Sequence, residues 1–545
     1  MSMSTVAEVF AHTLKEIGIR YVFGVPSGNM IDYMEALRKE VGIDFILVGH
    51  ETTAAFMAGV CGRLTGVPGA CFATFGPGAT NLSTGVGGAQ LDRFPLLAFT
   101  DEMPDDLLKR TVQMNINHQQ LFFPITKWTT RLNPNNIEEI ILKGAGITTD
   151  DTPGAVHIGI PAGIGRNPVK EAKSDVDYLR LEKKRWSPLV EDQVAKVEKL
   201  IHKSKKPVFA VGLSAVRAQV SEQLIALAEK CQVPVVLTPM AKGLFPEAHP
   251  LYAGVLFHAL SNEVAKVYSQ ADLVIGIGYD PVEFNYEDWM PEVPLIHINN
   301  SEADVAPGKF PEVSNVVGAV DVALNELLKL NVEPKEWDLQ FLKANKKQIV
   351  KKLTPETDSF GPLAVVAELR NAMSDDGILT VDVGAHLHLI GQQWHTPSPE
   401  KLLISNGWSS MGFAIPAALA AKLCNPGLPV VALMGDGGFL MTVGELAIAK
   451  RLNLNIVFVV IYDDSLSLIS IKQNKKHFDR SYGTDLNVLE GEPTNHYFGV
   501  PVVRVTNSNE YRSALKKAFS AAGPIVIEAV VGSKEYDQLV LQPNK

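Results

Sequence analysis

Two aspartates that follow apolar runs are the residues whose type and spacing best suit chemistry. Asp436 stands in the stretch VVALMGDGGF, and Asp463 follows the run NIVFVVIY. Two carboxylates at one sheet edge repel each other unless a cation lies between them. Mg²⁺ prefers oxygen ligands and usually completes its coordination with a phosphate. Since Gly435, Gly437 and Gly438 permit close backbone approach and a following helix offers N-terminal amides, the pattern predicts a site for a metal-bound diphosphate.

The elements around these aspartates would bring the two carboxylates together. Residues 429–434 and 455–462 are typical of buried strands, and residues 439–452 of one amphipathic helix between them. A strand, helix, strand unit of this length forms a right-handed crossover, so both strands end at the same edge of the sheet. We therefore expect both carboxylates to face one crevice. An ordinary Gly-Asp-Gly turn with Asp as a helix N-cap is the alternative interpretation.

The whole chain has an α/β pattern. Short apolar runs alternate with amphipathic stretches along its 545 residues, which is typical of parallel sheets covered by helices. Two charged segments punctuated by proline predict three doubly wound parallel-sheet domains, at residues 1–170, 188–335 and 358–535. In the middle domain several strands end in Gly or Pro, but no GxGxxG follows the first strand, so simple loops are favoured over a nucleotide site.

Composition excludes several classes of function. A formal net charge of -10 gives no basic surface for nucleic acid or an anionic membrane. The N-terminus lacks the features of a signal peptide, and the apolar runs are too short to span a bilayer. The cysteines are far apart in the sequence and do not have the spacing of metal ligands, which fits a reducing compartment. They are Cys61, Cys71, Cys231 and Cys424. We expect a cytoplasmic protein that acts on small molecules.

A second group of motifs stands in the first third of the chain. HETTAAFMA places Glu51 between a strand and a helix, and FGPGATN breaks a strand on Gly-Pro-Gly. Together with GVPSGN, PGAVHIGIP, SSMGFAIPAALAA and GDGGF, these motifs resemble the thiamine diphosphate-dependent enzymes, specifically the acetolactate synthase group of 2-oxo acid decarboxylases and carboligases. The resemblance covers nearly the whole chain. It implies pyrimidine-binding, central and diphosphate-binding domains, and a homodimer or homotetramer with active sites at the subunit interface.

The resemblance also implies roles for individual residues. Glu51 is expected to share a proton with the pyrimidine ring nitrogen of the cofactor, which drives formation of its imino form. A helix-start acid stabilised by the helix dipole is the alternative role for this residue. Met411 is expected to wedge between the two cofactor rings, and the carbonyl of Ser409 to accept from the amino group. An apolar Met is often only part of a core, so the role of Met411 rests on the resemblance.

Further positions follow from the same resemblance. The implied Mg²⁺ ligands are Asp436, Asp463 and the backbone carbonyl of Ser465, and the family usually has Asn at the position of Asp463. That difference adds a negative charge beside the diphosphate. The other implied cofactor-binding residues are Pro26, Gly28, Thr74, Gly76, Pro77, Asn81, Gly384, Ala385, His386, Gly435, Gly437, Gly438 and Leu466.

The substrate and flavin motifs depart from those of biosynthetic acetolactate synthases. Where those enzymes carry a Phe-Gln-Glu or His-Gln pair, this chain has Gln113 and Met114. His118, Gln119 and His386 remain candidate catalytic residues, although each is also open to a structural role. The segment GYDPVEFNYEDW resembles catabolic acetolactate synthases, which do without flavin, so tightly bound FAD is not expected.

The leading hypothesis is a carboligase dependent on thiamine diphosphate and Mg²⁺. It would decarboxylate pyruvate or a related 2-oxo acid and join the resulting enamine to an acceptor carbonyl. A simple 2-oxo acid decarboxylase or a 2-hydroxyacyl lyase of the same family is the second hypothesis. A non-catalytic thiamine diphosphate-binding regulatory protein is the third, and the presence of Glu51 argues against it. The missing GxGxxG disfavours an NAD-dependent dehydrogenase.

Overall fold

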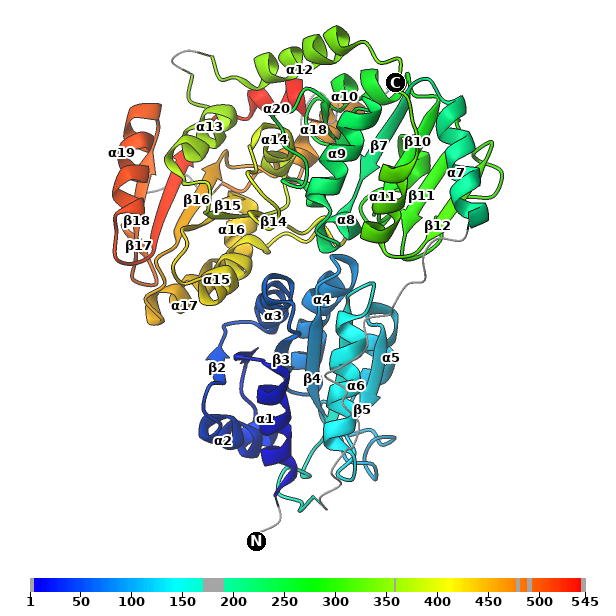
Figure 1. Cartoon of the computed structure of the whole chain (residues 1–545). Helices are drawn as coiled ribbons and strands as arrows, with labels where there is room; N and C mark the ends of the chain where they lie inside the picture. The colour runs from blue at the N-terminus through cyan, green and yellow to red at the C-terminus, as the bar shows by residue number, and fades with distance from the viewer. Residues whose placement is uncertain (1–3, 170–190, 357–358, 477–480, 488–492, 541–545) are drawn as a thin grey trace.

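Three α/β units follow one another along the chain, as Figure 1 shows from the blue N-terminal unit through the green central unit to the yellow and red C-terminal unit. The computed structural model describes residues 4–169, 191–356, 359–476, 481–487 and 493–540. The first expected domain boundary, at residues 170–188, lies outside these residues. Each unit is built on a sheet whose strands are mostly parallel, which confirms the predicted fold class.

The N-terminal unit has a six-stranded parallel sheet in the order β2-β1-β3-β4-β6-β5. Successive residues of its third strand point into two separate cores, since Ala70 and Phe72 pack in one and Cys71 and Ala73 in the other. Helices therefore cover both faces, which explains why the strand is apolar at every position. The strands are β1 (Tyr21–Gly24), β2 (Asp44–Leu47), β3 (Gly69–Ala73), β4 (Leu96–Glu102), β5 (Trp128–Arg131) and β6 (Ala155–Pro161), and the helices are α1 (Val6–Ile17), α2 (Ile31–Lys39), α3 (Glu51–Thr65), α4 (Pro77–Leu91), α5 (His118–Phe122) and α6 (Ile137–Thr149).

The central unit has a second six-stranded parallel sheet, in the order β12-β11-β10-β7-β8-β9. Its strands are β7 (Pro207–Val211), β8 (Val235–Leu237), β9 (Tyr252–Val255), β10 (Leu273–Ile277), β11 (Leu295–Asn299) and β12 (Val313–Val317), and its helices are α7 (Glu191–Lys203), α8 (Leu213–Arg217), α9 (Ser221–Cys231), α10 (Ser261–Tyr268) and α11 (Val320–Lys329). The helix α12 (Leu339–Leu353) follows and lies across the central and C-terminal units in Figure 1.

The C-terminal unit has a seven-stranded sheet in the order β14-β13-β15-β16-β19-β18-β17, in which the short pair β17 and β18 is antiparallel. Its strands are β13 (Ile378–Val381), β14 (Leu402–Ile404), β15 (Val430–Gly435), β16 (Val457–Tyr462), β17 (His496–Tyr497), β18 (Val500–Val505) and β19 (Ile525–Val530). Its helices are α13 (Pro362–Ala372), α14 (Ala385–Gln393), α15 (Ala414–Cys424), α16 (Asp436–Thr442), α17 (Leu446–Arg451), α18 (Ser467–Lys476), α19 (Ser508–Phe519) and α20 (Lys534–Leu539).

The expectation of one helix over residues 439–452 is wrong. The chain forms α16, a 3-10 turn at Val443–Glu445, and then α17. Gly444 is a poor helix former, and the Glu445 side chain reaches the N-terminal unit, where its Oε2 accepts a hydrogen bond from the Gly49 amide at 2.9 Å. The break between α16 and α17 therefore allows a contact between the N-terminal and C-terminal units. Local sequence patterns cannot predict this contact.

The N-terminal and C-terminal units share one apolar core. Helix α3 packs against α15, and the Phe56 ring meets the Phe413 ring edge to face with centroids 5.6 Å apart. This core holds the two units together within one chain, and α3 and α15 face each other in Figure 1. Among the described residues, no helix is both long and apolar enough to cross a membrane. The four cysteines are free, and a cytoplasmic location stays a prediction.

Candidate functional site

A pocket of about 200 Å³ opens at the carboxyl ends of β13, β15 and β16. Strands β15 and β16 pair in parallel, so the residues that follow them meet at one edge of the sheet. Every site residue that the sequence indicates in the C-terminal unit lines this pocket: Gly384, Ala385, His386, Ser409, Met411, Gly435, Asp436, Gly437, Gly438, Asp463, Ser465 and Leu466. Tyr536 of the C-terminal helix α20 also lines it, and no sequence pattern indicates that residue.

The two aspartates form a close pair within this pocket. Asp436 Oδ2 accepts hydrogen bonds from the amides of Asp464 at 2.6 Å and Asp463 at 3.2 Å. Burial, and then the charge of Asp463, raise the pKa of Asp436 to about 7. Burial raises the pKa of Asp463 to about 6, although Ser467 Oγ donates to Asp463 Oδ2 at 2.5 Å. A divalent cation would relieve this repulsion, so the donor set fits a hard metal ion with oxygen ligands.

The pocket wall fits an anionic ligand beside the aspartates. A Cβ on Gly437 would lie 2.6 Å from Leu466 Cδ2 and 3.1 Å from Met411 Cε, so a side chain there would fill the space. The Nε2 atom of His386 is buried and has no hydrogen-bond partner among the described residues. Burial lowers the pKa of His386 to about 4, so the ring is neutral. The glycine cradle and the unpartnered nitrogen together support a site for a phosphate-bearing group.

Asp382 supports the pocket from behind, and the sequence analysis missed it. It follows β13, is fully buried, and accepts hydrogen bonds from the Gly412 amide at 2.9 Å and the Val383 amide at 2.7 Å. Asp382 thereby fixes the turn that carries Ser409 and Met411 into the pocket. The signal was present, because ILTVD ends a buried strand on a carboxylate in the same way as the strand before Asp436.

A second group of residues gathers at the carboxyl ends of β2 and β3 in the N-terminal unit. Glu51 begins α3 with an exposed fraction of 8%, and Asn81 Nδ2 donates to Glu51 Oε2 at 3.0 Å. A Cβ on Gly78 would lie 2.8 Å from Thr74 Cγ2 and 3.3 Å from Glu51 Oε1. Gly76 has φ +65°, and a Cβ there would meet the Met114 carbonyl oxygen at 2.7 Å. The structure thus brings the conformationally restricted turn at Gly76 next to the buried carboxylate.

The remaining predicted residues of this unit lie near the same sheet edge. Pro77 is the first residue of α4, and Pro26 and Gly28 follow β1, which lies between β2 and β3 in the sheet. None of the seven predicted cofactor-binding residues of the N-terminal unit is among the residues that line the C-terminal pocket. The described part of one chain therefore carries two separate groups of predicted residues, the C-terminal group that lines the pocket and the N-terminal group around Glu51, which are called half-sites below.

His118 and Gln119 do not present free polar atoms for a substrate. His118 is 2% exposed, its Nε2 accepts from the Gly76 amide at 3.2 Å, and its Nδ1 lies 2.8 Å from Thr100 Oγ1. Gln119 Nε2 donates to Glu102 Oε1 at 2.6 Å, and Gln119 Oε1 accepts from Thr129 Oγ1 at 2.8 Å. In this structure internal hydrogen bonds engage the polar atoms of both side chains, so a direct catalytic contact of His118 and Gln119 stays a prediction.

Comparison with known families matches all three units. Residues 4–121 match "Thiamine pyrophosphate enzyme, N-terminal TPP binding domain", residues 194–327 match "Thiamine pyrophosphate enzyme, central domain", and residues 382–529 match "Thiamine pyrophosphate enzyme, C-terminal TPP binding domain". The two half-sites fall in the N-terminal and C-terminal matched regions.

Several curated relatives are similar over almost their full length. The chain is 31% identical to the acetolactate synthase of Bacillus subtilis, over 96% of this chain and 93% of the relative. It is 29% identical to a probable acetolactate synthase large subunit of Methanocaldococcus jannaschii, over 97% of this chain and 92% of the relative. It is 28% identical to the large subunit of acetolactate synthase isozyme 1 of Escherichia coli, over 97% and 94%. With all three domains matched and a relative 31% identical over nearly the whole chain, this chain belongs to the thiamine pyrophosphate-dependent enzymes of the acetolactate synthase family.

Proposed function

We propose that the protein is a Mg²⁺-dependent carboligase that decarboxylates pyruvate, or a closely related 2-oxo acid, and joins the remaining unit to an acceptor carbonyl. The observation that carries this proposal is the close pair of buried Asp436 and half-buried Asp463 in a glycine-walled pocket, combined with the buried acid Glu51 in the other half-site. The relatives named acetolactate synthase support the choice of reaction.

The residues of the C-terminal pocket are proposed to hold the cofactor by its diphosphate. Asp436, Asp463 and the carbonyl of Ser465 would bind Mg²⁺, and the glycines beside Asp436 would admit the phosphates. Met411 would support the bent form of the cofactor from the pocket wall. Bound thiamine diphosphate supplies the carbanion chemistry that 2-oxo acid decarboxylation requires.

Glu51 is proposed to hold and move one proton at the pyrimidine end. Asn81 fixes one carboxyl oxygen through its amide, and the turn at Gly76 to Gly78 packs against the other oxygen. The acid is buried at the first position of α3, so water is largely excluded from it. A buried, oriented carboxyl group of this kind is suited to proton exchange with a ring nitrogen.

A complete site is proposed to need two chains. In the described part of one chain, the pocket is lined by C-terminal residues, while Glu51 lies in the other half-site. Large apolar side chains are exposed close in sequence to each half-site, with Met441 64% exposed on α16 and Leu47 44% exposed at the end of β2. Apolar surface of this kind marks contact surfaces, so we propose a homodimer or homotetramer with active sites between subunits.

The enzyme is proposed to work without tightly bound FAD. The segment that follows β10 folds its own aromatic side chains against the central sheet: a Cβ on Gly276 would lie 1.9 Å from the Tyr286 hydroxyl. The Tyr279 and Tyr286 rings stack with centroids 4.3 Å apart, and Trp289 Nε1 donates to the Tyr279 hydroxyl at 2.9 Å. This packing supports the expectation drawn from the residues 278–289.

Product analysis tests the proposed reaction. The purified protein, incubated with pyruvate, thiamine diphosphate and Mg²⁺ without flavin, is expected to release CO₂ and form acetolactate. Acetaldehyde as the main product would contradict the carboligase proposal and establish a decarboxylase, the second candidate. That candidate is favoured by one observation, the internal hydrogen bonding of His118 and Gln119, which removes two polar groups from acceptor binding.

The substitution Gly438→Ala is expected to weaken cofactor binding. A Cβ at this position would lie 2.6 Å from Asp382 Oδ2, and that carboxylate is held by the amides of Val383 and Gly412. Displacing it costs about 1–3 kcal/mol and disturbs the turn that carries Met411. A calorimetric titration with thiamine diphosphate and Mg²⁺ measures the loss, which we expect to be about tenfold or more.

Gly444→Ala is the matched control, because a Cβ at Gly444 would meet no atom within 4 Å. Its cofactor affinity is expected to equal that of the unaltered protein. Equal affinities for both variants would show that the space beside Asp382 does not matter to the site.

A further inference from the structure

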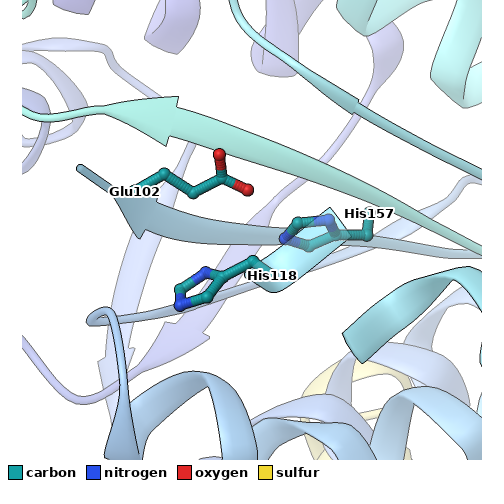
Figure 2. A group of neighbouring side chains, drawn as sticks. All are labelled: Glu102, His118 and His157. Atoms are coloured by element: carbon teal, nitrogen blue, oxygen red, sulfur yellow. The ribbon is translucent and has the colours of Figure 1, made fainter. Parts of the chain in front are cut away.

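Behind the turn at Gly76 lies a buried cluster of Glu102, His118 and His157, from β4, α5 and β6 (Figure 2). One potential ligand atom from each side chain lies within 4.8 Å of the others. All three side chains are nearly inaccessible, with exposed fractions of 3%, 2% and 0%. A group of this composition has two interpretations, a metal site or a hydrogen-bonded network.

The hydroxyl of Thr100 decides between them. Thr100 Oγ1 lies 2.8 Å from His118 Nδ1 and 2.7 Å from His157 Nε2, so it bridges the two rings. The other nitrogen of each ring is also engaged, since His118 Nε2 accepts from the Gly76 amide at 3.2 Å and His157 Nδ1 lies 2.8 Å from Thr129 Oγ1. All four ring nitrogens therefore have hydrogen-bond partners, and a metal ion would have to break some of these bonds.

The backbone amide of Gly76 fixes the direction of every bond that follows. An amide N–H can only donate, so His118 Nε2 carries a lone pair and the proton of the neutral ring is on Nδ1. The His118 Nδ1–H then donates to Thr100, which leaves the single Thr100 proton to donate to His157 Nε2. Burial lowers the pKa of His118 to about 4 and that of His157 well below its usual value, in agreement with two neutral rings.

The same logic continues to a charged end. With Nε2 of His157 as acceptor, its Nδ1–H donates to Thr129 Oγ1, and the Thr129 hydroxyl donates to Gln119 Oε1. Gln119 Nε2 donates in turn to Glu102 Oε1 at 2.6 Å. Arg131 Nε lies 2.6 Å from the second oxygen of Glu102. The Glu102 carboxylate packs against Gly159. A side chain at position 159 would clash with it, because a Cβ there would lie 2.3 Å from Glu102 Oε1.

We propose that this one-way hydrogen-bond chain is a positioning device for the half-site of Glu51, with His118 and Thr100 as positioning residues. The chain holds the Gly76 amide, and the turn that begins there places Gly78 against Thr74 and the Glu51 carboxyl group. Gly76 has a positive φ of +65° among the many conformations open to glycine, and the hydrogen bond from its amide to His118 Nε2 restricts the turn to this one. This inference rests on the proposed function, in which Glu51 meets the cofactor.

The first experiment interrupts the chain in its centre. Thr100→Val keeps the shape of the side chain and removes the hydroxyl, whereas Thr100→Ser keeps the hydroxyl. We expect Thr100→Val to raise the dissociation constant of thiamine diphosphate about tenfold, because a buried histidine nitrogen loses its partner, and Thr100→Ser to restore it. Thr129→Val interrupts the chain at a second point and is expected to act in the same direction.

Thr148→Val is the matched control. Thr148 is equally buried in the same unit, and its hydroxyl donates only to the Ala145 carbonyl within α6. The melting temperature of this variant is expected to fall by about as much as that of Thr100→Val. Its dissociation constant for thiamine diphosphate is expected to stay unchanged. An equal dissociation constant in Thr100→Val, Thr129→Val and Thr148→Val would overturn the positioning role.

The second experiment measures the histidine tautomers of the hydrogen-bond chain in protein without any cofactor. In protein labelled with ¹⁵N-histidine, the ring shifts of His118 and His157 are expected to show the neutral Nδ1–H tautomer, assigned with His118→Asn and His157→Asn variants. The Nε2–H tautomer in either ring would overturn the proposed hydrogen-bond chain. One equivalent of bound zinc, found by elemental analysis and lost in His157→Asn, would also overturn it. Failure of the wild type to bind thiamine diphosphate would refute the proposed function, while the tautomers would still report on the chain.

Discussion

Glu51→Gln is expected to lower kcat by about 10²–10⁴-fold while leaving the affinity for thiamine diphosphate and Mg²⁺ nearly unchanged. Glutamine has almost the same shape as glutamate and can still meet Asn81, which donates to Glu51 Oε2 in the structure. It cannot exchange a proton with a ring nitrogen. The expected result is therefore a protein that binds its cofactor and does not turn over pyruvate.

Steady-state kinetics and a calorimetric cofactor titration measure the two effects separately. Glu35→Gln is the control, because Glu35 lies on α2 of the same unit and is exposed beside Arg38. Its kinetics are expected to match those of the wild type. Full activity of Glu51→Gln would refute the proton-transfer role of Glu51.

Asp436→Asn is expected to remove detectable binding of thiamine diphosphate at millimolar Mg²⁺, a loss of about 10²-fold or more. The carboxylate is a proposed metal ligand, and it also accepts the amides of Gly437, Asp463 and Asp464. An amide of the same shape keeps part of these bonds and loses the charge that attracts the cation. Circular dichroism and the melting temperature show whether the variant is still folded.

Asp463→Asn is the informative companion to this variant. Since the resemblance implies Asn as the usual residue at this position, the variant is expected to keep its activity at saturating Mg²⁺. Removing one of two repelling carboxylates changes the Mg²⁺ concentration that is needed for half-maximal activity. Unchanged cofactor binding in Asp436→Asn would contradict the proposed metal site, whatever the behaviour of Asp463→Asn.

The sequence predicts the C-terminal half-site well because its signals are local. Asp436 and Asp463 each follow an apolar strand, and the right-handed crossover rule alone brings the two strand ends together. The glycines around Asp436 belong to the same short stretch. Asp382 carries the same signal after β13, and comparing the ends of all buried strands would have found it.

Other features depend on partners that are distant in the sequence. The break after α16 brings Glu445 to the amide of Gly49, which is 396 residues away, and no helical periodicity contains that contact. The role of His118 depends on Gly76 and Thr100, which are 42 and 18 residues away. A histidine in such a network and a histidine facing a substrate have the same local sequence, so only the fold separates the two roles.

The same limit applies to the pairing of the half-sites. The sequence motifs assign Glu51 and Asp436 to one function, and the shared core fixes how the two units pack within a chain. That packing leaves Glu51 outside the pocket of its own chain in the described residues. We therefore expect two chains to make each complete site.

Mixing two inactive variants tests this claim most directly. Equal amounts of the Glu51→Gln and Asp436→Asn proteins are mixed. They are then unfolded and refolded together, or left to exchange subunits. In a dimer with shared sites, each mixed dimer contains one site with both natural residues, so about a quarter of wild-type activity is expected to return. If each site were formed within one chain, the mixture would stay as inactive as its components, and that result would contradict the account.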